Sequence, residues 1–226
     1  MEIKSVTNIA TEFLRKQIIT GEMAAGQRIN ETDLAARLKI SRPPIREALR
    51  ILENEHLVVN CPRKGTNVAS ISIEDLKNTY QAREMLECYS IDILKGKNIR
   101  MLPNVIASVE AASRLSVPSQ DNREEIFNYL KAFVDFHIKL IESTGNGWVI
   151  HCYNSISSHL ARYQFVYLYI PTSGRRSIEE HKQILEFIKN GEYSKAKKFM
   201  KEHINYTFDF LKNKILNSGL KGQLSN

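Results

Sequence analysis

The sequence predicts a mainly α-helical protein in two parts: three short helices with a small β-hairpin, then an antiparallel bundle of about six longer helices. Up to about residue 70, the predicted elements are short and are separated by glycine or proline. From Ser72 onward, apolar residues recur at helical spacing over long segments with almost no strand signal. Short connections between long amphipathic helices favour antiparallel packing. We therefore expect two domains, over residues 1–71 and 72–226.

Three short helices are predicted in the first part, over residues 5–20, 31–38 and 42–54. Asn30 and Ser41 are suitable caps for the second and third helices, because their side chains can accept hydrogen bonds from free backbone N–H groups. Pro43 and Pro44 then fall in the first turn of the third helix, where a missing amide proton has little effect. The chemistry of these residues thus indicates where two helices begin.

Two β-branched segments follow, LVVN at 57–60 and TNVASI at 66–71. They flank CPRKG, whose proline and glycine suit the tip of a hairpin. Ser70 to Ser72 is the predicted joint between the two parts. In the bundle, we expect helices to be interrupted near Lys97, Pro118, residues 145–147, Gly174 and Gly191.

Composition narrows the class of protein. With 226 residues, each part can bury a core without disulfide bonds, and 42% hydrophobic residues is usual for a folded globular protein. No segment suits a secretory signal or is long enough to span a bilayer, so we expect a cytoplasmic protein with no membrane partner. Cys61, Cys88 and Cys152 are an odd number without paired spacing, which favours reduced thiols.

Charge points to a polyanionic partner, because the formal net charge is +7. Between residues 39 and 64, six basic side chains stand against three acidic ones. Within this segment, Arg42, Arg46 and Arg50 recur every four residues on one face of the third predicted helix. Arginine can donate two hydrogen bonds to guanine in the major groove of DNA, and neighbouring arginines can bind phosphate. Taken alone, such a stripe is also compatible with an ordinary solvated helix face.

The run from GEMAAGQRINETDLAARLKISRPPIREALRILENEHLV to PRKGTNV resembles the winged helix-turn-helix of the GntR family of bacterial regulators. The resemblance implies that Arg42 contacts bases and that Ser41 and Arg46 bind phosphate. The wing tip would then lie near the minor groove. The full predicted DNA-contacting set is Thr32, Ser41, Arg42, Pro44, Arg46, Arg50, Arg63, Lys64 and Gly65. His56 departs from the family, which usually has glycine there, and Thr32 stands where some relatives have a base-contacting arginine.

The second part is similar to the FCD domain of the FadR-type branch of that family, through YQAREMLE, FHIKLIESTGN, SIEEHKQIL and NGEYSKAKKFMKEHI. The resemblance implies a divalent metal held by His137, His181 and His203, for which zinc or nickel would be suitable. The family's aspartate ligand is replaced by Phe133, and Asp135 lies on nearly the opposite helix face. Other interpretations are ordinary core histidines, or histidines that donate hydrogen bonds directly to an anionic effector.

Arg83 matches an arginine that, in relatives, faces the cavity and pairs with an acidic effector. The alternative interpretation is an ion pair with Glu87 on the helix surface. Arg162 and Tyr163 are further candidates for the effector pocket, whereas His151 and His159 are interpreted as packing or surface residues.

The resemblance implies a non-enzymatic repressor that binds an inverted-repeat operator as a homodimer and responds to a small carboxylate effector. One alternative is a small metal-dependent hydrolase that uses the three histidines. The sequence has no HExxH pair and no general base beside these histidines, which disfavours it. A DNA-binding architectural protein with a structural dimer domain is the other alternative.

Overall fold

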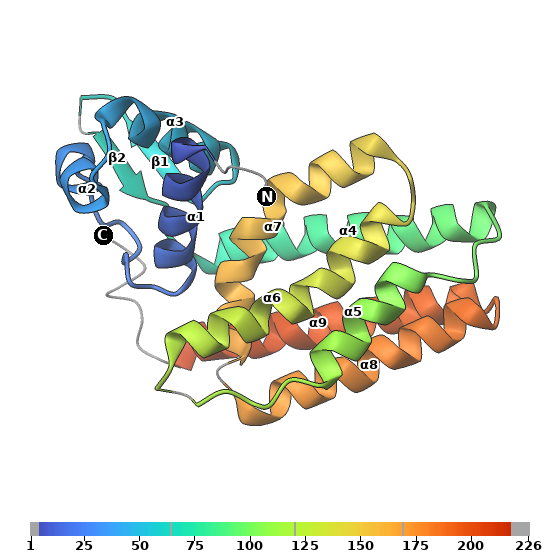
Figure 1. Ribbon diagram of the computed structural model, residues 1–226. Coiled ribbons are helices and arrows are strands. Elements are labelled where there is room, and N and C mark those ends of the chain that lie inside the picture. Colours follow the sequence, from blue (N-terminus) through green and yellow to red (C-terminus); the bar gives the residue numbers. More distant parts are fainter. Residues whose placement is uncertain (1–4, 64, 120, 169, 218–226) are drawn as a thin grey trace.

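The structure, a computed structural model, describes residues 5–63, 65–119, 121–168 and 170–217. Its elements form two groups, of which the smaller lies at one end of a helical bundle (Figure 1). The smaller group comprises α1 (Val6–Ile19), α2 (Glu31–Leu38), α3 (Arg42–Asn54), β1 (Val58–Cys61) and β2 (Gly65–Val68). The bundle comprises α4 (Ile73–Gly96), α5 (Pro103–Ser113), α6 (Arg123–Glu142), α7 (Gly147–Leu168), α8 (Pro171–Lys189) and α9 (Tyr193–Asn217). The predicted mainly helical fold is confirmed.

Side chains next to the helix ends explain where α2 and α3 of the small group begin. The Asn30 side chain accepts hydrogen bonds from the backbone N–H groups of Thr32 (2.9 Å) and Asp33 (3.4 Å), which begins α2 as expected. Ser41 occupies the cap position of α3, but its side chain makes no capping hydrogen bond. The predicted capping bond of Ser41 is therefore wrong, since the prolines that follow leave fewer N–H groups to be capped.

The predicted hairpin is present, with Val58 opposite Val68 and Cys61 opposite Gly65. The second strand ends at Val68, earlier than the sequence indicated. A bridge between Arg28 and Asn67 extends the pairing beyond the two named strands. His56 has a φ of 58°, a conformation that favours glycine, so the histidine adopts a backbone conformation that the family's usual glycine takes without strain. Lys64 lies outside the described residues.

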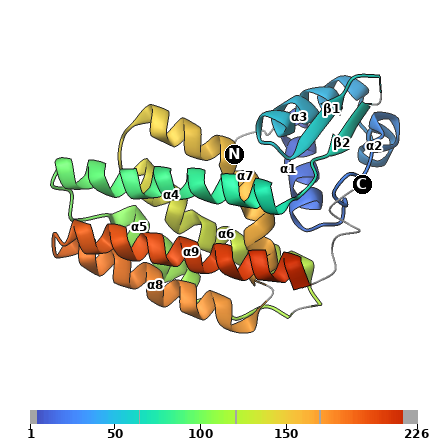
Figure 2. The same ribbon diagram turned by 180° about the vertical axis from the view of Figure 1, so that it is seen from behind.

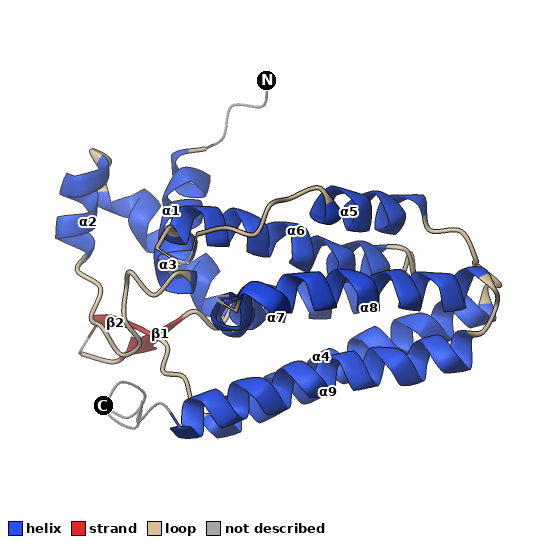
Figure 3. Ribbon diagram, turned by 90° about the horizontal axis from the view of Figure 1, so that it is seen from below, coloured by secondary structure: helices blue, strands red, loops and turns tan. Residues whose placement is uncertain are grey.

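The bundle has a large core to which every helix from α4 to α9 contributes. Helices α4 and α9 run side by side, as do α5 and α6, and α8 lies along α9 (Figures 2 and 3). The interruption predicted near Gly174 lies between the end of α7 at Leu168 and the start of α8 at Pro171, and α8 runs through Gly174 itself. A Cβ at Gly174 would overlap the Tyr129 ring, so this glycine allows α8 to approach α6. Among the described residues, no helix is both long and apolar enough to cross a membrane.

The small group contacts the bundle through side chains that bind backbone carbonyl groups. Arg123 at the start of α6 donates a hydrogen bond of 2.8 Å to the carbonyl of Thr20. Arg162 on α7 donates one of 3.1 Å to the carbonyl of Ala69, next to the predicted joint. Ile19 at the end of α1 is buried in the bundle core. Helices α6 and α7 therefore hold the small group at two places, after α1 and after β2.

Candidate functional site

The arginine stripe of α3 faces solvent. The side chains of Arg42, Arg46 and Arg50 are 57%, 60% and 77% exposed. Ile45, Leu49 and Leu52 lie on the opposite side of the helix and are buried in the core of the small group. The amphipathic spacing in the sequence therefore produces an exposed basic face, next to the amino end of α3.

Glu31 at the start of α2 contacts this basic face. One oxygen of its carboxylate lies 3.3 Å from Nη2 of Arg42 and 3.9 Å from Nε of Arg46. Ion pairs between exposed side chains contribute little to stability, so both arginines are free to exchange this partner for another anion. Glu31 was not among the predicted residues, because its contact with the arginines joins two helices and has no signature within either.

The hairpin adds further basic side chains. Arg63 at its tip is exposed and has a φ of 65°, and Gly65 follows with a φ of 83°. The Arg28 guanidinium lies beside Gly65, with Nε 3.7 Å from where a Cβ would stand. Arg28 was not among the predicted residues, because only the long-range bridge to Asn67 places it next to the wing. Thr32 is exposed at the start of α2.

A second candidate site lies inside the bundle. His137 on α6, His181 on α8 and His203 on α9 are all buried, and each offers one ring nitrogen within 4.8 Å of the others. They line a cavity of about 20 Å³ together with Arg83 and Phe133. This volume holds about one water molecule or one ion. The three histidines predicted from separate segments are thus brought together.

Two carboxylates support these histidines. Oε2 of Glu87 lies 2.8 Å from Nδ1 of His137, and Oε2 of Glu180 lies 2.7 Å from Nδ1 of His203. Tyr153 also donates a hydrogen bond of 3.1 Å to Glu87. A carboxylate on the far nitrogen of a histidine is the usual support for a metal-binding imidazole. Neither glutamate was predicted in this role, although both stand in the segments that resemble the family.

Arg83 is 1% exposed and joins the same network. Its Nε donates a hydrogen bond of 2.8 Å to Glu87, and its Nη2 lies 2.8 Å from Nε2 of His137. The predicted pair between Arg83 and Glu87 exists, but its predicted position on the helix surface is wrong. Both residues face inward because α4 packs between other helices, and Arg83 lines the cavity. Burial lowers the pKa of His137 to about 4, with Arg83 adding to this effect and Glu87 opposing it.

The surroundings of the His181 ring favour a bound ligand. Its ring stacks on Phe136 at a centroid distance of 3.8 Å, and its Nε2 is buried with no hydrogen-bond partner among the described residues. Burial lowers the pKa of His181 well below its ordinary value, and His137 and His203 add to this. A neutral, unpartnered ring nitrogen beside two supported histidines is a suitable donor for a divalent metal. The three residues therefore fit such an ion, although Arg83 already contacts Nε2 of His137.

Arg162 and Tyr163, the further candidates for the effector pocket, are not among the described residues that line this cavity. Tyr163 donates a hydrogen bond of 2.5 Å to Asp75 at the start of α4, and Nε2 of His159 lies 2.6 Å from the same carboxylate oxygen. With the bond from Arg162 to Ala69, these residues hold the joint between the two groups. His159 is buried there, as its packing interpretation expected, and His151 is exposed.

Family models match both groups of elements. Residues 8–68 match the model of the gntR family of bacterial regulatory proteins, and residues 78–206, more than half of the chain, match the FCD domain. The chain belongs to the GntR family. This GntR regulator is therefore a DNA-binding transcription regulator with an FCD domain and not an enzyme, so the hydrolase alternative is not supported.

Relatives of this GntR regulator span nearly its whole length. It is 27% identical to the uncharacterized HTH-type transcriptional regulator YdhC of Bacillus subtilis, over 91% of this chain and 90% of the relative. It is 25% identical to the gluconate operon transcriptional repressor of Bacillus licheniformis, over 93% and 85% of the two chains. A GntR regulator from Rhodococcus has the same fold, with a TM-score of 0.72 at 21% identity over 93% of this chain and 99% of that one.

Proposed function

We propose that this GntR regulator is a homodimeric repressor whose operator affinity is controlled by a small carboxylate bound in the bundle. The observation that carries the proposal is the position of α7. Gln164, Tyr167 and Leu168 of this helix line the histidine cavity, whereas Arg162 and Tyr163 hold the joint to the winged part. A helix that contacts both places can transmit a displacement from one to the other.

On the DNA side, Arg42 contacts base edges and Ser41 and Arg46 bind phosphate. The exposure of these residues and the absence of a capping bond at Ser41 support these roles. Thr32, Pro44 and Arg50 border the same surface, and the wing tip of Arg63, Lys64 and Gly65 follows the adjacent minor groove. The protein acts in the cytoplasm, where bacterial DNA is found. Its two winged parts, related by two-fold symmetry, bind the two halves of an inverted repeat.

On the effector side, Arg83 and the three histidines form the binding site. An effector carboxylate accepts hydrogen bonds from Arg83, which lines the cavity, while Glu87 stays bound to Nε of the same guanidinium, and pairing of carboxylate with guanidinium is strong in a buried site. When zinc or nickel is held by His137, His181 and His203, it supplies additional positive charge for the same carboxylate. Because the present cavity of about 20 Å³ is smaller than such a molecule, binding must separate the surrounding helices. This is the source of the displacement of α7.

Repression is supported by the relative that represses a gluconate operon. We expect Arg42→Ala to weaken binding to an operator obtained by in vitro selection by about 1–3 kcal/mol and to loosen its sequence preference. Arg63→Ala, at the wing, weakens binding to all sequences more evenly and lowers the dependence on salt. Fluorescence anisotropy with labelled duplexes measures both, and Arg175→Ala on the exposed surface of α8 is the matched control.

If Arg42→Ala changes neither the affinity for the operator nor the preference for its sequence, α3 is not the recognition helix. The same assay tests the homodimer, because a dimer prefers an inverted repeat to a single half-site. A protein that remains monomeric at micromolar concentration and binds one half-site tightly would contradict it.

Effector control is tested by reciprocal binding. A thermal melting screen of small carboxylates, sugar acids and fatty acyl compounds identifies a compound that stabilises the native protein. We expect operator DNA to change the affinity for this compound by the same factor by which the compound changes the affinity for DNA. Calorimetric titrations with and without operator measure the two factors. Equal affinity in both titrations excludes the compound as the effector.

A further inference from the structure

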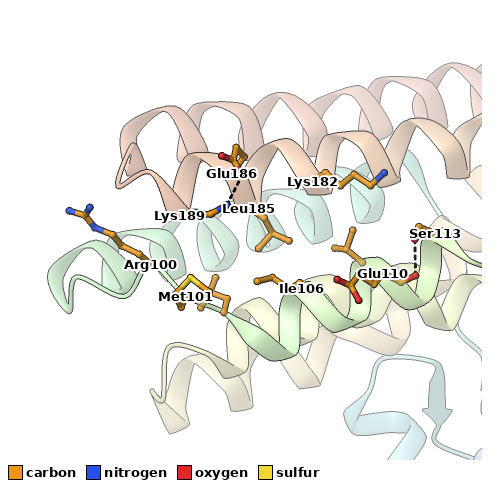
Figure 4. A pocket seen from close by; sticks show the side chains of 11 residues that line it. Arg100, Met101, Ile106, Glu110, Ser113, Lys182, Leu185, Glu186 and Lys189 are labelled. Carbon is orange, nitrogen blue, oxygen red and sulfur yellow. Dashed lines mark hydrogen bonds and ion pairs between the residues drawn. The ribbon is translucent and has the colours of Figure 1, made fainter.

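A larger cavity lies between α5 and α8, further along α8 than the histidine site. Its volume is about 340 Å³, within the range usual for small-molecule sites. None of the described residues that line this cavity also lines the histidine cavity. Figure 4 shows the side chains of both helices turned toward this space. The two cavities are therefore separate sites.

The middle of this cavity is apolar. Leu102 and Val109 form buried walls, and Ile106 and Leu185 are partly buried and face one another across it (Figure 4). Met101 stands at the rim and is 63% exposed. Methionine is flexible and polarizable, so this side chain can fold over a hydrocarbon group. A ligand with an apolar body would bury both its own surface and that of Met101.

The edge of the cavity is charged, with three basic residues and two acidic ones, a net charge of +1. These residues are Arg100, Lys182, Lys189, Glu110 and Glu186. Most of them are already paired: Glu186 with Lys189 at 3.7 Å, Lys182 with Glu179 at 2.8 Å, and Glu110 with Arg114 at 3.6 Å. Arg100 differs, because it forms no ion pair within the part of the chain that the structure describes, and its Nε donates only to the neutral amide of Asn98 at 3.2 Å.

Arg100 is an exposed side chain at the edge of this cavity. Its guanidinium packs against Gly191 in the turn between α8 and α9, where a Cβ would stand 3.0 Å from Cζ of Arg100. Gly191 has a φ of 75°, a conformation that favours glycine in this turn. An arginine at the mouth of an apolar cavity, without a charged partner among the described residues, can pair with the carboxylate of a ligand there.

We propose that this cavity is a second ligand site, which binds a hydrophobic monocarboxylate such as a medium-chain fatty acid. The carboxylate accepts two parallel hydrogen bonds from Arg100, and the chain lies against Leu102, Ile106 and Leu185. Glu110 and Glu186 disfavour anions of higher charge, such as phosphate esters. The site is independent of the histidine cavity and of the proposed effector there.

Octanoate is the probe, with 1-octanol as its neutral counterpart. By isothermal calorimetry, we expect one octanoate to bind per chain, and Arg100→Gln to weaken it at least tenfold while leaving 1-octanol unchanged. Ile106→Trp fills the cavity and abolishes the binding of both. Arg175→Gln, which removes an exposed arginine elsewhere on α8, leaves both unchanged. In protein with ¹³C-labelled methionine methyl groups, octanoate shifts the Met101 resonance, assigned through Met101→Leu.

Several outcomes overturn the proposal. Octanoate binding that survives Arg100→Gln and Ile106→Trp but is lost in His181→Ala places the ligand in the histidine cavity. The absence of saturable octanoate binding to a wild-type protein with a native circular dichroism spectrum removes the site altogether. If Ile106→Trp instead dissociates the homodimer, the cavity is an interface between two copies of this chain.

Discussion

Replacing Arg83 with methionine lowers the free energy of unfolding by about 3–5 kcal/mol, because the carboxylate of Glu87 is left buried without its counter-ion. The two side chains are 1% and 0% exposed and lie 2.8 Å apart. Urea denaturation followed by circular dichroism measures the loss. The double variant Arg83→Met/Glu87→Leu is more stable than the single variant, because it removes both charges. It does not reach the wild type, since His137 and Tyr153 lose their acceptor.

Arg114→Met is the matched control, because Arg114 and Glu110 form a pair with the same four-residue spacing on the exposed face of α5. We expect this control to change stability by less than about 0.5 kcal/mol. If Arg83→Met loses no more stability than Arg114→Met, the buried ion pair of Arg83 and Glu87 contributes nothing to the free energy of unfolding.

The difference in free energy of unfolding between the wild type and Arg83→Met becomes smaller as the pH falls. Burial alone raises the pKa of Glu87, but the charges of Arg83 and His137 hold it well below its ordinary value near 4.5. Below that pH, the unfolded wild type binds a proton that the folded wild type does not, so the wild type loses stability. Without Arg83, the folded protein can protonate Glu87, and this variant loses less.

Phe133→Asp raises the metal content of the purified protein, and His181→Ala abolishes it. Phe133 is 5% exposed and lines the histidine cavity one helical turn before His137. A carboxylate there adds a ligand and a negative charge that offsets the dication and Arg83. We expect the affinity for zinc or nickel to change about 10–100-fold, the size of effect known for supporting residues of metal sites. Elemental analysis after purification without chelator, with calorimetric titration of each metal, provides the measurement.

Phe133→Asn is the control for Phe133→Asp, because asparagine has nearly the same shape as aspartate but carries no charge. If the metal content rises equally in both, the relief of crowding and not the carboxylate is responsible. A wild type without metal even in the presence of effector, together with no gain in Phe133→Asp, means that the three histidines bind no metal. They would then donate hydrogen bonds to the effector directly.

The residues of α3 illustrate what sequence pattern predicts well. The spacing of Arg42, Arg46 and Arg50 places them on one face by helix geometry alone, and Ile45 takes the buried face for the same reason. Arg83 illustrates the opposite case. Its partner, one turn away, was predicted from spacing, but its burial depends on how α4 packs against other helices, which no local pattern determines.

By itself, the sequence determined the helix starts at Asn30 and at the two prolines of α3, the hairpin, and through family resemblance the three buried histidines. These features depend on chemistry within a few residues or on motifs shared with relatives. Only the tertiary structure decided that Glu87 and Glu180 support the histidines, that Glu31 contacts the arginine face, and that Arg162 and Tyr163 lie at the joint. Their partners are set by helix packing, since carboxylates distant in sequence meet a buried or basic group only after the chain has folded.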